Sequence, residues 1–294
     1  NIKYHMKISV LIITYNQENL ISKAIDSILN QTIIPEEIII SDDNSNDNSL
    51  MVMEKYQDMY PHLIRIHQTP KNLGIAGNIK FGASHCKEDV ITLLSGDDYL
   101  RCTAIELIKK NTPTNINLNN LLVVSNVVTE YKGEFFHNKK TKININNIKS
   151  KTIRKKHEFL KIAISKNLLL DADYPEKSIG IWADWCFDYN ISKQVQEVIK
   201  LKEYLYVYRN NIGVSSSTGE FDMDQSNIRA INYIIEREIN FKLREKLFLL
   251  YQKKLSISRA EQTIMDRIEL LFLFLITITD SYKFHRYTIS KIVK

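Results

Sequence analysis

Two pairs of aspartates stand where an apolar run of the sequence ends. Asp42-Asp43 follows the run 37–40, and Asp97-Asp98 follows the run 90–94. Neighbouring carboxylates repel, so such clusters persist where a cation or hydrogen-bond donors compensate their charge, and hard oxygen ligands of this kind suit Mg²⁺ or Mn²⁺ on a phosphorylated substrate. The alternative is that each aspartate forms a turn by bonding nearby backbone amides. Two pairs at corresponding strand ends favour the functional interpretation.

The segments around these pairs alternate between strand and helix patterns. Apolar runs predict strands over residues 7–14, 37–40, 64–67, 90–94, 121–131 and 203–208. Amphipathic spacing predicts helices over residues 20–29, 49–60, 76–86 and 185–195. Such alternation is typical of an α/β fold with a parallel sheet covered on both faces, in which ligands gather at the carboxyl ends of the strands.

The rest of the chain is basic or helical. Residues 132–161 contain ten Lys or Arg against two Glu and are expected to form a loop. We place a boundary at the Gly- and Ser-containing turn 213–219, beyond which the pattern is helical, and these helices either pack on their own domain or form a coiled-coil homodimer. The basic, partly apolar tail 281–294 fits either a helix on an anionic membrane or a frayed terminus. Residues 1–5 are expected to be an expression leader.

Composition and missing motifs exclude several classes of protein. The 294 residues are 44% hydrophobic and 25% charged, which excludes wholesale disorder, and the strongest apolar run, of ten residues, is too short for a membrane span. Three widely spaced cysteines argue against disulfide and zinc frameworks and indicate reduced thiols in a cytoplasmic protein. The sequence lacks Gly-rich phosphate loops, dinucleotide fingerprints, nucleophile elbows, zinc-protease spacing and nucleic-acid reader motifs.

Five segments in order closely resemble the family 2 inverting glycosyltransferases of GT-A fold, of the bacterial surface-polysaccharide type. They are Val10 to Asn16, Ala24 to Thr32, Glu37 to Ser45, Asn72-Leu73-Gly74 and Ser95-Gly96-Asp97-Asp98. The resemblance is strong over residues 6–102 and weakens toward residue 217. It implies a GT-A (Rossmann-like), mostly parallel sheet flanked by helices over residues 6–218, with an all-helical extension over residues 219–294.

The resemblance also implies a nucleotide-sugar site. Tyr15, beside Thr14, would stack on the base, and Asp43 would accept the imide N–H of uracil, which makes UDP the expected nucleotide. Further contacts to the nucleotide and its diphosphate are implied for Asn72, Asn78, Ser95, Asp97, Asp98 and Arg209. Asp97 and Asp98 would hold Mn²⁺ or Mg²⁺. Ser95 stands where the family usually has a first aspartate, which is expected to weaken metal binding.

A carboxylate further along the chain matches the family's general base. Asp184 would take the proton of the acceptor hydroxyl, although Ala183 replaces the usual Glu; the alternative is an N-cap of the following helix. Trp182 and Trp185 flank it, and we expect one of them to line the sugar site and the other to be core. Asn211 stands where the family often has His. The alternative for Arg209 is a solvated arginine at a strand end.

The resulting expectation is an enzyme that transfers a sugar from a UDP-sugar to a hydroxyl of a saccharide acceptor. The basic stretches and the substrates usual in the family favour, as acceptor, a lipid-diphosphate-linked glycan of bacterial O-antigen, lipopolysaccharide or capsule synthesis. The protein is expected to be cytoplasmic and peripheral on the inner membrane face. No nucleic-acid partner is expected. Two alternatives remain open: a non-catalytic nucleotide-sugar-binding module, and a nucleotidyltransferase.

Overall fold

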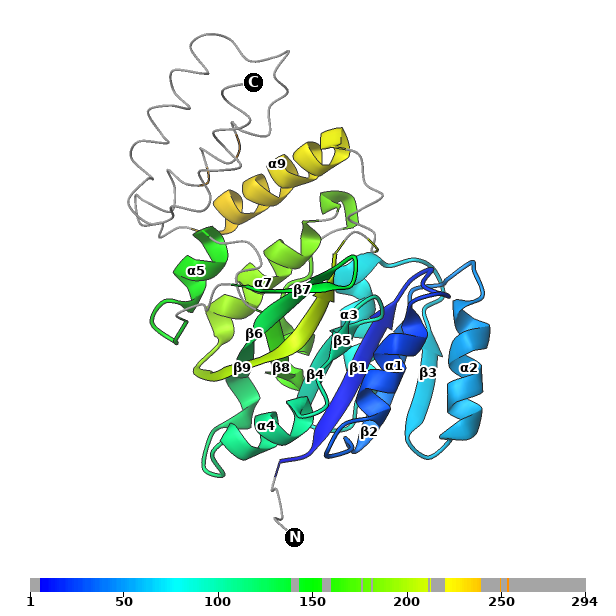
Figure 1. Cartoon of the computed structure of the whole chain (residues 1–294). Coiled ribbons are helices and arrows are strands. Elements are labelled where there is room, and N and C mark those ends of the chain that lie inside the picture. The colour runs from blue at the N-terminus through cyan, green and yellow to red at the C-terminus, as the bar shows by residue number, and fades with distance from the viewer. Residues whose placement is uncertain are drawn as a thin grey trace. The chain divides into compact units, whose positions relative to one another are not determined.

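A computed structural model describes residues 6–138, 143–154, 160–175, 177–180, 182–210, 212, 220–238, 249 and 253. The chain divides into two compact units, residues 1–218 and residues 219–294. In the first unit the strands form one sheet in the order β3-β2-β1-β4-β8-β6-β9-β5, and β7 pairs with β6 (Figure 1). Helices flank this sheet, so the α/β fold class expected from the sequence is confirmed.

The first half of the sheet is parallel, as expected. It contains β1 (Ile8–Thr14), β2 (Glu37–Asp42), β3 (Ile64–Gln68) and β4 (Val90–Ser95). All residues of β2 are buried, which fits a strand covered on both faces. The connecting helices are α1 (Ile21–Leu29), α2 (Ser49–Met59) and α3 (Gly74–His85).

The second half of the sheet mixes strand directions. It contains β5 (Tyr99–Leu100), β6 (Leu121–Tyr131), β7 (Glu134–His137), β8 (Leu160–Ser165) and β9 (Glu197–Arg209). β8 lies antiparallel between β4 and β6, whereas β9 runs parallel to β6. The helices are α4 (Ala104–Asn111), α5 (Ile148–Arg154), α6 (Lys166–Asp171) and α7 (Ala183–Gln194). The loop expected over residues 132–161 is wrong, because β7, α5 and the start of β8 lie within it.

Two apolar cores hold the helices on opposite faces of the sheet. One core joins β1 and β2 to α1, α2 and α4; it includes Val10, Ile25 and Met53. The other joins the opposite face to α3, α5, α6 and α7; it includes Leu11 and Phe187. Adjacent residues Val10 and Leu11 enter different cores because successive strand side chains point to opposite faces. Helix, sheet and helix layers therefore fix the strand ends from both sides.

The second unit contains α9 (Glu220–Arg237). Its apolar residues Ala230, Ile231 and Ile234 are fully buried. No described helix is both long and apolar enough to cross a membrane. The helical pattern expected over residues 264–278, with its alternatives of packing on its own domain or forming a dimer, and the basic tail 281–294 lie outside the described residues.

Candidate active site

The carboxyl ends of three neighbouring strands bring the two acidic segments together. Thr14, the last residue of β1, pairs with Asp42 of β2, and Ile13 pairs with Ser95 of β4. The backbone continues this contact beyond the strands, because the Asp43 N–H donates to the Thr14 carbonyl at 2.9 Å and the Gly96 N–H donates to the Ile13 carbonyl at 2.9 Å. Residues 42–43 and 95–98 therefore flank the end of one strand.

The two aspartates of the first pair have different roles: Asp42 forms a turn, and Asp43 binds the backbone at the start of α3. Asp42 is fully buried and accepts the Ser45 N–H at 3.0 Å, as the turn alternative predicts. Asp43 instead reaches the start of α3, where its Oδ1 accepts the Leu73 N–H at 2.7 Å and its Oδ2 accepts the Gly74 N–H at 2.8 Å. Thr69 adds a third bond, donating its hydroxyl to Oδ1 at 3.2 Å. The contact between Asp43 and uracil stays a prediction, and the geometry gives the carboxylate a structural task as well.

Asn78 holds the ends of β1 and β2 together from α3. Its Nδ2 donates to the carbonyls of Ser41 at 3.0 Å and Thr14 at 3.3 Å, and its Oδ1 accepts the Ser41 hydroxyl at 2.5 Å. The side chain is 3% exposed. Because both amide atoms bond protein groups in the core, the nucleotide contact expected for Asn78 is not supported, and its role here is to brace the strands.

The other residues expected at the nucleotide lie around these strand ends. Thr14 is buried and donates its hydroxyl to Gln17 Oε1 at 2.8 Å. Tyr15 follows it and is half-buried, and Asn72 is half-buried in the segment that precedes α3. The stacking role of Tyr15 and the ligand contact of Asn72 stay predictions.

The turn after β4 presents one aspartate and buries the other. Asp97 is half-buried, and its Oδ1 accepts the hydroxyl of Ser95. Asp98 is 4% exposed; its Oδ2 accepts the Tyr206 hydroxyl at 2.8 Å and its Oδ1 accepts the Arg209 N–H at 2.8 Å. Burial, reinforced by the Asp97 charge and opposed by these hydrogen bonds, raises the pKa of Asp98 to about 7. The two aspartates thus have different tasks.

This turn is held tightly against β1 and α1. A Cβ added at Gly96 would lie 2.3 Å from Gln17 Oε1, 2.9 Å from Ile21 Cδ1 and 3.2 Å from Thr14 Cβ. The lack of a side chain at Gly96 therefore allows the turn to approach β1, and this approach places Asp97 beside the end of that strand.

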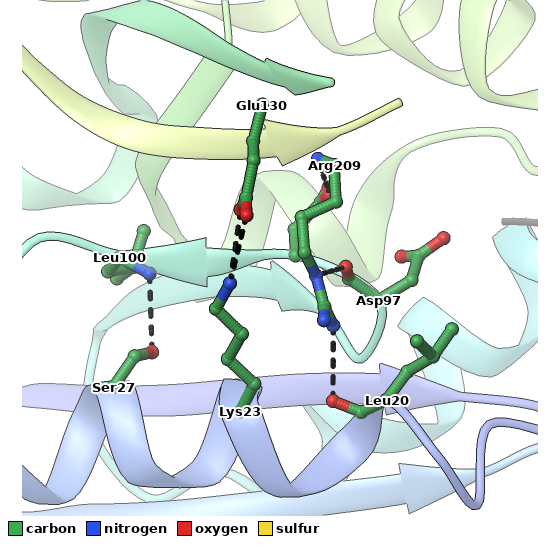
Figure 2. A network of polar contacts seen from close by, with 8 residues as sticks. Leu20, Lys23, Ser27, Asp97, Leu100, Glu130 and Arg209 are labelled. Atoms are coloured by element: carbon green, nitrogen blue, oxygen red, sulfur yellow. Dashed lines mark hydrogen bonds and ion pairs between the residues drawn. The ribbon is translucent and has the colours of Figure 1, made fainter. Parts of the chain in front are cut away.

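Arg209, the last residue of β9, joins the two halves of the sheet. Its Nη2 donates to the Leu20 carbonyl at 3.1 Å, and its Nε donates to the Asp97 carbonyl. Figure 2 shows the side chain between the turn that carries Asp97 and the start of α1, with Lys23 and Glu130 beside it. Lys23 Nζ lies 3.1 Å from Glu130 Oε2. The alternative of a solvated arginine is wrong, because the guanidinium is bonded to two backbone carbonyls.

Asp184 lies in the first turn of α7 rather than at the N-cap, which Trp182 occupies. Its Oδ1 accepts the Trp185 N–H at 2.7 Å, and a carboxylate in this turn is favoured by the positive end of the helix dipole. Trp185 is 1% exposed and donates its indole N–H to the Thr152 carbonyl at 2.7 Å, so it is the core member of the tryptophan pair. Trp182 is half-buried. α7 packs against α3, the helix that begins beside Asp43.

The described side chains at this site offer a divalent cation few carboxylate ligands. Within the described residues, no group of three or more His, Cys, Asp or Glu side chains is arranged to hold a metal ion. Asp97 fits such a role because it is partly accessible, and Mg²⁺ is commonly held by one or two carboxylates together with substrate phosphates. Asp98 does not fit, because Tyr206 and Arg209 already occupy its two oxygens. The expectation that Asp98 is a metal ligand is therefore not supported by this geometry.

Sequence reasoning missed two residues that shape this site. Tyr206 donates to Asp98, and its hydroxyl oxygen also accepts the Ser95 N–H at 3.4 Å. Glu130 binds Lys23 through its side chain, and its carbonyl accepts the Asn210 N–H at 2.8 Å. Tyr206 lies in a strand that the sequence predicts, but nothing in the sequence indicates which aspartate it meets. Asn211, which stands where the family often has His, lies outside the described residues.

Comparison with known proteins decides the family. The profile of "Glycosyl transferase family 2" matches residues 9–170, more than half of the chain. The chain belongs to glycosyl transferase family 2. Solved structures share the fold: the family 2 chain aligns with Staphylococcus aureus TarS in complex with UDP-GlcNAc at a TM-score of 0.64 and 17% identity, over 92% of this chain and 80% of that one. The mannosyltransferase PcManGT from Pyrobaculum calidifontis, in complex with GDP-Man and Mn²⁺, aligns at 0.58 and 14% identity, over 98% and 79%.

Sequence relatives of this family 2 chain include a protein named as a glucosyltransferase and one named as a chondroitin synthase. The poly(ribitol-phosphate) beta-glucosyltransferase of Bacillus spizizenii is 36% identical over 102 residues, which cover 34% of this chain and 16% of the relative. The chondroitin synthase of Pasteurella multocida is 40% identical over 103 residues, which cover 35% of this chain and 10% of the relative. The matched segments therefore span less than a fifth of these two relatives.

Proposed function

We propose that this chain transfers a sugar from a UDP-sugar, with inversion, to a hydroxyl group of a saccharide acceptor. The observation that carries the proposal is the meeting of the Asp43 and Asp97 segments at the end of β1, with Arg209 bonded across the same turn. In an α/β sheet, ligands bind at the carboxyl ends of the strands. The family membership and the UDP complexes of TarS support a nucleotide-sugar as that ligand.

The protein groups divide the proposed reaction between them. Tyr15 would stack on the nucleotide base, and Asp43 would accept the imide N–H of uracil. Arg209, which uses two of its five N–H groups on carbonyls, offers further donors to the diphosphate as negative charge develops on it. A Mn²⁺ or Mg²⁺ ion held by Asp97 and the diphosphate would supply additional charge stabilisation.

Inversion follows from a single displacement. The acceptor hydroxyl oxygen forms a bond to the anomeric carbon while the bond from that carbon to the diphosphate oxygen breaks, and UDP leaves with the electron pair. A carboxylate oxygen of Asp184 takes the hydroxyl proton as general base.

The acceptor is proposed to be a lipid-diphosphate-linked saccharide of a bacterial surface polysaccharide, used at the inner membrane face. The support is the excess of basic residues over 132–161 and 281–294 and the surface-polymer enzymes among the relatives. Flotation with and without residues 281–294 tests the membrane contact, and equal recovery in the soluble fraction would remove that part of the proposal.

A panel of UDP-sugars, scored by thermal shift with and without Mn²⁺ and then by UDP release with a saccharide acceptor, tests the central reaction. We expect one UDP-sugar to stabilise the protein more than UDP does, and release to depend on acceptor. Normal UDP binding without transfer or hydrolysis of any UDP-sugar would favour the nucleotide-sugar-binding module. Pyrophosphate release from UTP and a sugar phosphate would favour the nucleotidyltransferase.

A further inference from the structure

The hairpin formed by β6 and β7 carries exposed aromatic side chains. Phe135 is 53% exposed and Phe136 is 49% exposed, and all four residues of β7 are exposed. Phenyl rings are large apolar surfaces that a soluble domain normally buries. Two adjacent rings on one exposed strand therefore mark a surface that another phase or molecule covers.

The two rings point to opposite faces of the strand. Phe135 pairs with Glu130 and Phe136 pairs with Thr129, and successive residues of a strand alternate between its faces. A rigid partner that lay on one face of the hairpin would cover only one ring. A fluid apolar phase that surrounds the end of the hairpin covers both rings at once.

The turn of the hairpin has the chemistry of a membrane interface. Lys132 and Gly133 form it with positive φ angles, and a Cβ added at Gly133 would meet nothing within 4 Å. The Lys132 ammonium lies 5.3 Å from the centroid of the Tyr131 ring. Tyrosine and lysine are typical of the boundary between headgroups and acyl chains, where the ring is partly buried and the ammonium reaches anionic headgroups. The sequence from residue 132 to 161 is strongly basic, which complements an anionic lipid surface.

The same hairpin is bonded to the candidate active site close to its turn. Glu130 binds Lys23 of α1, and its carbonyl accepts the N–H of Asn210, next to Arg209 (Figure 2). Phe135 stands directly opposite Glu130 across the strand pair, at a Cα separation of about 5 Å for such pairs. Any surface that takes up the rings therefore lies next to the donor site.

We propose that the β6–β7 hairpin inserts Phe135 and Phe136 into the headgroup boundary of an anionic membrane and thereby holds the donor site against it. The proposal deepens the proposed function, on which it rests for the lipid-linked acceptor. It assigns the contact to a structured hairpin and not to the basic tail alone.

Co-sedimentation of the full chain with vesicles of phosphatidylglycerol and phosphatidylcholine, compared with pure phosphatidylcholine, tests the proposal. Replacing both rings, Phe135→Ser with Phe136→Ser, is expected to weaken partition onto the anionic vesicles by about tenfold or more, since two apolar side chains lose their burial. The matched control is Met51→Ser with Met59→Ser, which removes two side chains of 49% and 62% exposure from α2 and should leave partition unchanged. Equal loss in both double variants, no loss in the hairpin variant, or no partition of the unaltered chain would overturn the proposal.

A second variant keeps the test valid if the double serine variant does not fold. Phe136→Trp should retain partition, and its emission should shift to the blue and be quenched by brominated lipid when anionic vesicles are added. An emission spectrum that vesicles leave unchanged contradicts insertion. Normal partition of the double serine variant, together with a raised KM for a soluble saccharide acceptor, also contradicts insertion. That result would make the hairpin a glycan-binding surface instead. UDP affinity, measured by calorimetry without lipid, separates the two proposals: an unaltered chain that partitions but binds no UDP refutes the proposed function alone.

Discussion

The two halves of the sheet are built on different principles. The half from β1 to β4 is parallel, each strand is followed by its own helix or turn, and its strand ends carry Asp43 and Asp97. The half from β6 to β9 pairs strands in both directions and contributes Tyr206 and Arg209 from far along the chain. The first half supplies the edge at which we propose that the nucleotide binds, built from local sequence signals, and the second half is bonded to that edge and carries Asp184. The following changes separate these tasks.

The largest expected effect is on chemistry supplied by the second half. Asp184→Asn removes the proposed base while keeping the shape of the side chain, so kcat should fall by about 10² to 10⁴ with UDP affinity unchanged. Initial rates of UDP release and calorimetry with UDP measure the two quantities. Transfer at the normal rate would exclude Asp184 as the base and would leave the second half with a purely structural task.

Overpacking tests how tightly the first half is built. A Cβ at Gly82 of α3 would lie 2.5 Å from Leu11 Cδ1 and 2.8 Å from Ser41 Cβ. Gly82→Ala should therefore lower the free energy of unfolding by about 1–3 kcal/mol, measured by denaturant titration. Ser84→Ala, at an exposed position of the same helix, should change it by no more than about 0.5 kcal/mol. Similar values for both would mean that α3 can shift on the sheet.

One hydrogen bond between the two halves, from the Tyr206 hydroxyl to Asp98, can be removed by a single substitution. Tyr206→Phe leaves the buried Asp98 without the donor at its Oδ2, so the free energy of unfolding should fall by about 1–3 kcal/mol. Tyr204→Phe removes an exposed hydroxyl that donates to the Asn138 carbonyl at 3.2 Å and should cost less than about 1 kcal/mol. If the two variants were equally stable, the Tyr206 hydroxyl would contribute nothing to holding the buried Asp98.

The smallest expected effect concerns the ion pair beside Arg209. Lys23 and Glu130 are 45% and 19% exposed, so Glu130→Gln should lower the free energy of unfolding by about 1 kcal/mol or less, and by still less in high salt. The comparison variant is Glu36→Gln, whose partner Lys109 is 4% exposed and lies 2.7 Å away. This loss should be larger, because it leaves a buried ammonium uncompensated. The reverse order would show that the surface pair carries more of the link between the halves than its exposure predicts.

The sequence predicted the first half well because its signals are local. Strand and helix bounds from residue 7 to 95 agree with the structure to within a few residues, and alternating apolar runs and polar turns mark them. Between residues 132 and 161, dense positive charge hid β7, α5 and β8, whose pairing partners lie elsewhere in the chain. Charge patterns report solvation, whereas strand pairing depends on distant partners.

The candidate site was also predicted only in part, and again the local features were the predictable ones. That residues 42–43 and 95–98 would meet followed from parallel strands ending at one edge. That Asp98 would be buried under Tyr206 did not follow, because the two residues are 108 positions apart. The hydrogen bonds that Asn78 makes to two strand ends were not foreseen for a related reason: an asparagine that bridges two strand ends and one that faces a ligand have the same sequence signature.

The hydrogen bonds that Asp43, Asn78 and Asp98 make within the protein bear on how this family 2 chain could change during evolution. Each of these side chains already has protein partners, so a substitution that altered sugar preference there would also loosen the scaffold. Substitutions that change donor or acceptor preference should then occur at half-buried positions such as Tyr15 and Trp182, where a different side chain should not unfold the protein. A library randomised at those two positions should yield folded variants far more often than one randomised at the braced three.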